Sequence, residues 1–238
     1  MTAATVVHKT SLAATVDAVN EAFFLGAALP ASVKRGAARW IAGRHGGRDS
    51  YAGMPAPTPR DIGGGSGSSR ERMATRAGSA HILGEEACRA LLLLNADDEV
   101  VRQALEVGTV SMVRRLRDSR DRETRAGREW LGAYCCARCT CALWRHFTVG
   151  GLRDADPHRW LRAGMKGLRA HRKGDGKWRR FPFDYTLLAL CEMDLPEAIR
   201  EMQYAAGACE RLLRRPSTAG DKYERRRRIV AERVLARC

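Results

Sequence analysis

His81 and Glu85 are the residues of this chain whose types and spacing best suit proton transfer. They stand four positions apart near the start of an apolar, helix-like stretch, and residues at i and i+4 share one face of a helix. Such a pair can act as an acid and a base, or bind a metal ion. Asp184 holds a comparable position before another apolar stretch. His81, Glu85 and Asp184 are therefore the catalytic candidates; the alternative is a structural role, in which acidic residues complement a helix dipole.

Four of the eight cysteines are crowded into the run CCARCTC, which starts at Cys135. On a helix Cys139 lies one turn from both Cys135 and Cys136, whereas Cys141 points to another side. Tetrahedral zinc needs four converging ligands, which one straight helix cannot supply. Cys135, Cys136 and Cys139 are the metal candidates, with help from elsewhere. The favoured alternative is packing, because buried cysteine behaves as a small hydrophobe and paired C-x-x-C knuckles are missing. We therefore expect no cofactor, with zinc as the alternative.

Several common catalytic motifs do not occur in the chain. It has no GxxxxGK[ST] phosphate loop, no GxGxxG after a strand and no GxSxG nucleophile turn. These absences argue against P-loop nucleotide hydrolases, Rossmann dinucleotide enzymes and α/β-hydrolases. No catalytic set can be identified, so the sequence leaves enzyme activity open and favours a non-enzymatic role.

The chain is strongly basic, with a formal net charge of +15 and a pI of about 10.1. The cations gather where amphipathic segments end and loops begin, in residues 34–48, 114–122, 169–180 and 211–228. An anionic partner is one explanation. Complementing the negative ends of helix dipoles is the other, at about 0.3 to 1 kcal/mol for each cation.

Two kinds of helical segment alternate along the chain. Residues 198–213 place apolar side chains on one stripe and charged ones on the other side, as do residues 160–168 and 101–116. Each of these segments is predicted to be an outer helix with one face exposed to solvent. Residues 183–191, 133–144 and 88–94 are apolar on nearly every side, so protein must cover them and they form an inner layer. Trp130, Trp178 and Tyr223 lie at similar offsets before the inner segments.

This alternation predicts an all-α protein of about four α/α helical hairpins, stacked as an arc or partial toroid. Residues 33–42 and 82–94 supply the faintest hairpin, and a helix over residues 12–29 precedes it. Residues 54–79 are rich in Pro, Gly and Ser and are predicted to be a flexible insertion. Alternating Val/Ile/Thr runs, which would indicate strands, are absent. We treat residues 1–238 as a single domain.

Residues 160–193 resemble the repeat of the terpenoid cyclase and protein prenyltransferase superfamily. The matching positions include Asp175, Gly176 and Trp178 of a DG-W loop, together with the helix residues Leu168, Tyr185, Leu188 and Leu190. The other repeats match weakly, the usual glutamine before DG is replaced by residues 171–173, and no D-x-D-D motif occurs. The resemblance implies an α/α toroid with a central cavity that in this family holds isoprenoid or peptide substrates, with zinc in the prenyltransferases.

We expect a helical-repeat binding or scaffold protein that holds an apolar or anionic ligand, or a protein partner, in its concave face. The candidate ligand contacts are aromatic and cationic: Trp178, Tyr185, Tyr134, Arg179 and Arg180. One alternative is a prenyltransferase- or terpene cyclase-like enzyme acting on an isoprenoid, and a second is a basic nucleic-acid-binding protein. Asp17 and Glu21 interrupt the apolar stretch near the start, so we expect a cytoplasmic protein without a membrane span.

Overall fold

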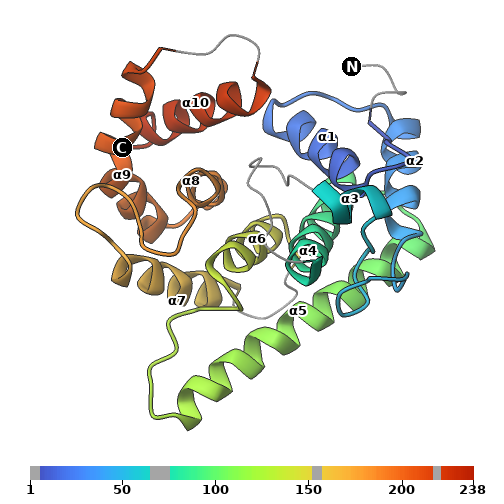
Figure 1. Ribbon diagram of the computed structural model, residues 1–238, viewed down its shortest axis with the longest axis horizontal. Coiled ribbons are helices and arrows are strands. Elements are labelled where there is room, and N and C mark those ends of the chain that lie inside the picture. The colour runs from blue at the N-terminus through green and yellow to red at the C-terminus, as the bar shows by residue number, and fades with distance from the viewer. Residues whose placement is uncertain (1–5, 65–75, 152–156, 217–220) are drawn as a thin grey trace. The chain divides into compact units, whose positions relative to one another are not determined.

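The computed structural model describes residues 6–64, 76–151, 157–216 and 221–238 (Figure 1). These residues form ten helices and no strand, which confirms the all-α prediction. No helix among them is both long enough and apolar enough to cross a bilayer. The helices are α1 (Leu12–Phe24), α2 (Ala31–Ala42), α3 (Pro59–Gly64), α4 (Arg76–Leu94), α5 (Glu99–Arg125), α6 (Ala137–Thr148), α7 (Pro157–Ala170), α8 (Phe183–Cys191), α9 (Pro196–Arg214) and α10 (Lys222–Leu235).

The chain forms two compact units. Unit 1 comprises residues 1–114 and 149–152, and unit 2 comprises residues 115–148 and 153–238. The long helix α5 begins in unit 1 and continues into unit 2. The stacking of four hairpins into one arc remains a prediction.

Helix α4 is the centre of unit 1, where it packs against α1, α2 and α3. Its leucines Leu83, Leu91 and Leu94 lie in the core with apolar residues of α1 and α2. Asp61 of α3 holds the start of α1 in place, because its carboxylate accepts hydrogen bonds from the Ser11 hydroxyl at 2.6 Å and from the Leu12 amide at 2.9 Å. A buried carboxylate at a helix amino end also complements the dipole.

The segment predicted to be a flexible insertion, residues 54–79, contains ordered structure at both ends. Residues 54–58 are buried, and the Met54 side chain is fully enclosed. Arg44 donates from its guanidinium to the Ala56 and Pro57 carbonyls at 2.6 and 2.8 Å, which secures the segment. Residues 59–64 form α3, and residues 76–79 begin α4. The Gly/Ser run lies largely outside the described residues. Composition missed the packed part because Met54 and Ala56 are buried by long-range contacts.

Asp98 caps the start of α5 and pairs with Arg39 of α2. One carboxylate oxygen accepts from the Val100 amide at 3.0 Å, and the other lies 2.5 Å from the Arg39 Nε. The hydrogen bond from Arg39, together with the amides of the first turn, lowers the pKa of Asp98 below its ordinary value. A lowered carboxyl pKa stabilises the fold above the unfolded-state pKa of about 3.9, and this contribution is lost as the pH falls further.

We expect the Asp98→Asn variant to lose less stability than the wild type when the pH falls below about 4, because asparagine retains the cap but not the titrating charge. Urea unfolding at pH 7 and at successively lower pH values measures this difference. Asp97→Asn is the matched control, since Asp97 is exposed and pairs with Arg102 at the surface. Identical pH profiles for Asp98→Asn and the wild type would contradict the assignment.

In unit 2, α8 packs against both α6 and α10, while α7 packs against α9 (Figure 1). Residues 185–190 of α8 are all buried, as the apolar pattern predicted. Helices α7 and α9 each bury an apolar stripe, with Trp160, Met165 and Leu168 buried in α7 and Met202 and Cys209 in α9. Glu201, which the pattern placed on the exposed side of α9, is also buried. Apart from this residue, the predicted difference between half-exposed and enclosed helices is confirmed in this unit.

Candidate functional site

His81 and Glu85 are neighbours inside unit 1, as their spacing predicted. The His81 Nε2 lies 2.8 Å from a carboxylate oxygen of Glu85, and both side chains are buried. The imidazole also stacks on the Tyr51 ring, with ring centroids 4.0 Å apart. A carboxylate beside a histidine fixes the orientation of the ring. This geometry suits an acid–base pair as well as a structural one, so a catalytic role for His81 and Glu85 remains a prediction.

More buried polar groups surround this pair on α1 and α4. The Asn20 amide donates to Glu86 at 3.1 Å, and Arg89 donates to the Asn20 carbonyl oxygen. Asp17 is also buried. Burying charged groups is unfavourable unless they are paired and hydrogen-bonded, and here α1 and α4 supply partners to each other. The sequence indicated polar interruptions in α1 but not this pairing.

Asp184 lies in unit 2, in the first turn of α8. Its carboxylate is 3.9 Å from the Arg227 Nε of α10, and both side chains are about one-third exposed. Burial raises the pKa of Asp184, while Arg227 and Lys177 act in the opposite direction. A catalytic role for Asp184 remains a prediction, as it does for His81 and Glu85.

Trp178 holds the loop between α7 and α8 against α9. Its indole Nε1 donates to Glu201 at 3.0 Å, and Arg172 contacts the same carboxylate through two hydrogen bonds of 3.1 and 2.9 Å. The Tyr204 hydroxyl accepts hydrogen bonds from two amides of this loop and donates to the Lys177 carbonyl. The DG-W loop of the sequence is thus a rigid connection between α7 and α8.

The other predicted ligand contacts differ in their surroundings. Arg179 and Arg180 are exposed in the loop before α8, and Tyr134 is buried before α6. Tyr185 is buried in α8 with the Arg145 guanidinium 5.5 Å from its ring centroid. Arg145 in turn binds Glu192 through two hydrogen bonds of 3.0 Å. Tyr185 therefore lies where α6 packs against α8.

Helices α6 and α8 run in the same sense, so their amino ends lie together. Cys141 of α6 meets Thr186 in the first turn of α8 at 3.6 Å, whereas Arg145 reaches Glu192 at the end of α8. Helix α10 instead crosses α8, which Figure 1 shows end-on while α10 runs across the view. Its Arg227 meets Asp184 in the first turn of α8, and its Val230 carbonyl lies beside the Cys191 sulfur at the other end of α8. Each helix amino end carries a partial positive charge of roughly +0.5.

Cations accumulate around these amino ends and on α10. Arg138 lies in the first turn of α6, half-buried, and burial lowers its pKa while Tyr185 acts in the opposite direction. Arg226 of α10 is buried, with its guanidinium 5.5 Å from the Tyr223 ring centroid. Arg227 and Lys177 flank Asp184. The acids nearby are Asp184 and, at the start of α10, Asp221 and Glu224.

The cysteines fall into two groups. Burial raises the pKa to about 12 for Cys88, Cys141 and Cys209 and to about 11 for Cys191, which is typical of packing thiols. Cys135 and Cys136 are instead exposed and lie just before α6, near Cys139 in its first turn. The prediction of a structural role suits the first group.

Comparisons with known proteins add no assignment. No protein-family model matches the chain, no curated protein matches it, and no solved structure matches it. The resemblance of residues 160–193 to the terpenoid cyclase and prenyltransferase repeat therefore remains an expectation.

Sequence reasoning missed the enclosure of Arg138 and Arg145 in α6. Arg138 lies within residues 133–144, the segment interpreted as an apolar inner helix, and Arg145 directly follows it. An arginine within such a segment is the signal that could have identified them, because a buried guanidinium requires an anionic partner or aromatic faces. Arg226 and Arg227 were noted only as part of a basic run, since nothing local separates a buried arginine from an exposed neighbour.

Proposed function

We propose that the protein binds a small anionic ligand, such as a phosphate ester, a diphosphate or a carboxylate, at the amino ends of α6 and α8, beside the arginines of α10. The observation that carries this proposal is the placement of cations around the first turn of α8, with Arg138 near Tyr185 and with Arg227 and Lys177 near Asp184. Backbone amides and dipoles at helix amino ends favour anions, and guanidinium groups bind phosphate and carboxylate oxygens in pairs.

The balance of basic and acidic side chains supports an anionic ligand at the arginines. Arg138, Lys177, Arg226 and Arg227 exceed the acids of this end, and the helix dipoles add further positive potential. Partial burial strengthens each interaction, because electrostatic attraction is larger where water is excluded. Tyr185 and Tyr223 add aromatic surface beside the cations, which suits a ligand with an apolar portion.

The binding role agrees with the expectation of a helical-repeat binding protein. The alternative of an isoprenoid-type substrate uses the same chemistry, because a diphosphate would engage the same cations. The nucleic-acid alternative differs, since it would draw on exposed cations over the whole surface and would weaken steeply with salt.

Inorganic pyrophosphate, titrated by calorimetry at low and moderate salt, tests the proposal. We expect Arg138→Gln to weaken its binding by about 10-fold or more, because a hydrogen bond to a charged group contributes about 1.5 to 3 kcal/mol. Arg200→Gln is the matched control, because Arg200 is an exposed arginine of the outer helix α9.

Equal weakening by Arg138→Gln and Arg200→Gln, or no binding of pyrophosphate by the wild type, would refute a localised anion site. A labelled oligonucleotide titrated under the same conditions distinguishes the nucleic-acid alternative. That alternative would be favoured if the oligonucleotide bound with a steep salt dependence and Arg200→Gln weakened it as much as Arg138→Gln.

A further inference from the structure

We propose that Cys135, Cys136 and Cys139 bind one thiophilic divalent metal ion, of which zinc is the natural candidate. The three thiols lie in unit 2, at the start of α6. The inference goes beyond the proposed anion site, because different side chains and a ligand of opposite charge are involved.

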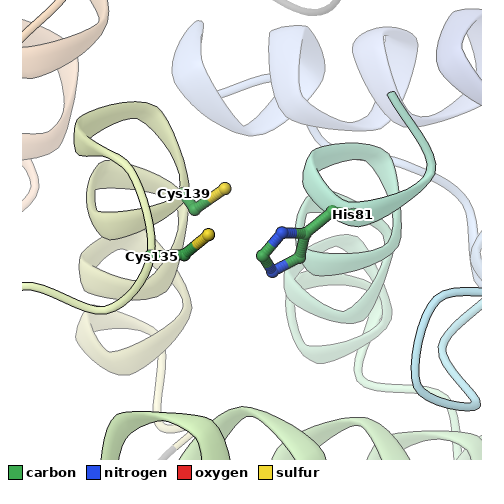
Figure 2. A group of neighbouring side chains, drawn as sticks. All are labelled: His81, Cys135 and Cys139. Atoms are coloured by element: carbon green, nitrogen blue, oxygen red, sulfur yellow. The ribbon is translucent and has the colours of Figure 1, made fainter. Parts of the chain in front are cut away.

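The local backbone removes the objection that one straight helix cannot gather these thiols. Helix α6 begins at Ala137, so Cys135 and Cys136 belong to the irregular segment before it and only Cys139 is helical. Figure 2 shows Cys135 and Cys139 projecting from the same side of this helix start, with their sulfurs close together. His81, the third residue drawn there, belongs to α4 of unit 1.

Two of the sulfur separations lie near those of a metal thiolate site. The Cys136 and Cys139 sulfurs are 3.3 Å apart, and the Cys135 and Cys139 sulfurs lie within 4.8 Å of each other. Two sulfurs on one tetrahedral zinc ion are about 3.8 Å apart, given Zn–S bonds of about 2.3 Å. Cys135 and Cys136 are exposed, so metal binding requires their side chains to rotate until both sulfurs share one ion with Cys139.

A hydrogen-bond donor and a positive charge lie beside two of the three thiols. The Cys139 amide donates to the Cys136 sulfur at 3.4 Å, and the positive end of the α6 dipole lies beside it. The Arg138 guanidinium interacts electrostatically with Cys139. On binding, each ligating thiol releases its proton to solvent and forms a bond from sulfur to the metal. A fourth position stays open for water or another donor.

Cys141 shows by contrast why this trio is distinct. It lies two residues further along α6 but is fully buried, and its sulfur is engaged with the Thr186 hydroxyl. Its position on another side of the helix excludes it from the same ion. The metal proposal therefore concerns three thiols and not the whole CCARCTC run.

Titration of the reduced full-length protein with Zn²⁺ and Cd²⁺ tests the proposal. We expect one ion per chain, and with Cd²⁺ a thiolate-to-metal charge-transfer band in the ultraviolet. A triple variant with Cys135→Ser, Cys136→Ser and Cys139→Ser should lose the band and bind more than about 100-fold more weakly, since even outer-shell partners of a metal contribute about 10- to 100-fold. The control is Cys238→Ser, which removes an exposed thiol elsewhere and should leave the titration unchanged.

A second readout uses the wild type alone and so does not depend on the folding of a variant. Zn²⁺ should slow alkylation of the three cysteines relative to Cys238, as measured by peptide mass spectrometry. Equal alkylation rates with and without Zn²⁺, or equal metal binding by the triple variant, would overturn the proposal. So would a Cys136–Cys139 disulfide that forms readily in a chain that binds no metal, because it would indicate a redox pair. Pyrophosphate binding by the triple variant tests the anion site separately.

Discussion

The Gly167→Ala substitution is expected to destabilise unit 2 by about 3 kcal/mol, at the upper end of the usual range for overpacking. A methyl group at Gly167 in α7 would lie 2.0 Å from the Leu131 carbonyl oxygen, far inside van der Waals contact. The obstacle is backbone, which cannot rotate away as a side chain would. The neighbouring Gly164 is similarly confined, because a methyl group there would lie 2.5 Å from the Trp144 indole nitrogen.

Urea unfolding followed by tryptophan fluorescence measures this effect, because four of the five tryptophans belong to unit 2. Gly207→Ala is the matched control in α9. Its methyl group would meet only the end of the Arg211 side chain at 3.5 Å, an ordinary contact. There we expect a gain of about 0.5 to 1 kcal/mol from the higher helix propensity of alanine. If Gly167→Ala and Gly207→Ala had the same effect, α7 could not approach residue 131 so closely.

The Glu201→Ala substitution should destabilise unit 2 by about 2 to 4 kcal/mol. It removes the acceptor of Trp178 and Arg172 together, and losing one partner of a buried ion pair typically costs about 3 to 5 kcal/mol. We take a lower range because the Arg172 side chain is 29% exposed and can recover some hydration. Glu201→Gln should fall between the wild type and Glu201→Ala, since its amide oxygen can still accept one hydrogen bond.

Glu210→Ala is the matched control, because it also removes a carboxylate from an ion pair but the pair is exposed. Glu210 lies in the same helix, and its pair with Arg214 is exposed, with a separation of 3.5 Å. Such surface pairs contribute about 0 to 1 kcal/mol, so this change should be nearly neutral. Quenching or shifting of tryptophan emission in Glu201→Ala alone would show that the Trp178 contact is lost. A Glu201→Ala variant as stable as Glu210→Ala would mean that the loop does not depend on this carboxylate.

The helical class and the division into enclosed and half-exposed helices could be predicted from the sequence. Residues 185–190 and residues such as Met165 and Leu168 carry the signal in their own spacing, because a helix repeats every 3.6 residues and the period depends only on the local chain. The proximity of His81 and Glu85 was predictable for the same reason, since four residues make about one turn. Their chemical role was not, because it depends on what else reaches them.

The candidate sites depended on tertiary structure. Arg138 and Arg227 both come near the first turn of α8 only because α6 and α10 pack on that helix, a relation between segments almost ninety residues apart. Trp178 carried the most recognisable sequence pattern, yet the buried carboxylate of Glu201 engages it in a structural contact. No local pattern reveals which distant side chain will supply a hydrogen-bond partner.

The cysteines illustrate both what the sequence predicts and what depends on tertiary structure. The sequence by itself determined that three thiols are close in the chain and that at most three could share an ion. Only the structure decided that α6 starts at Ala137, so that two of these thiols precede the helix and turn toward the third. Where a helix begins depends on the capping and burial of its first turn, which the rest of the fold supplies, whereas the helical period belongs to the backbone.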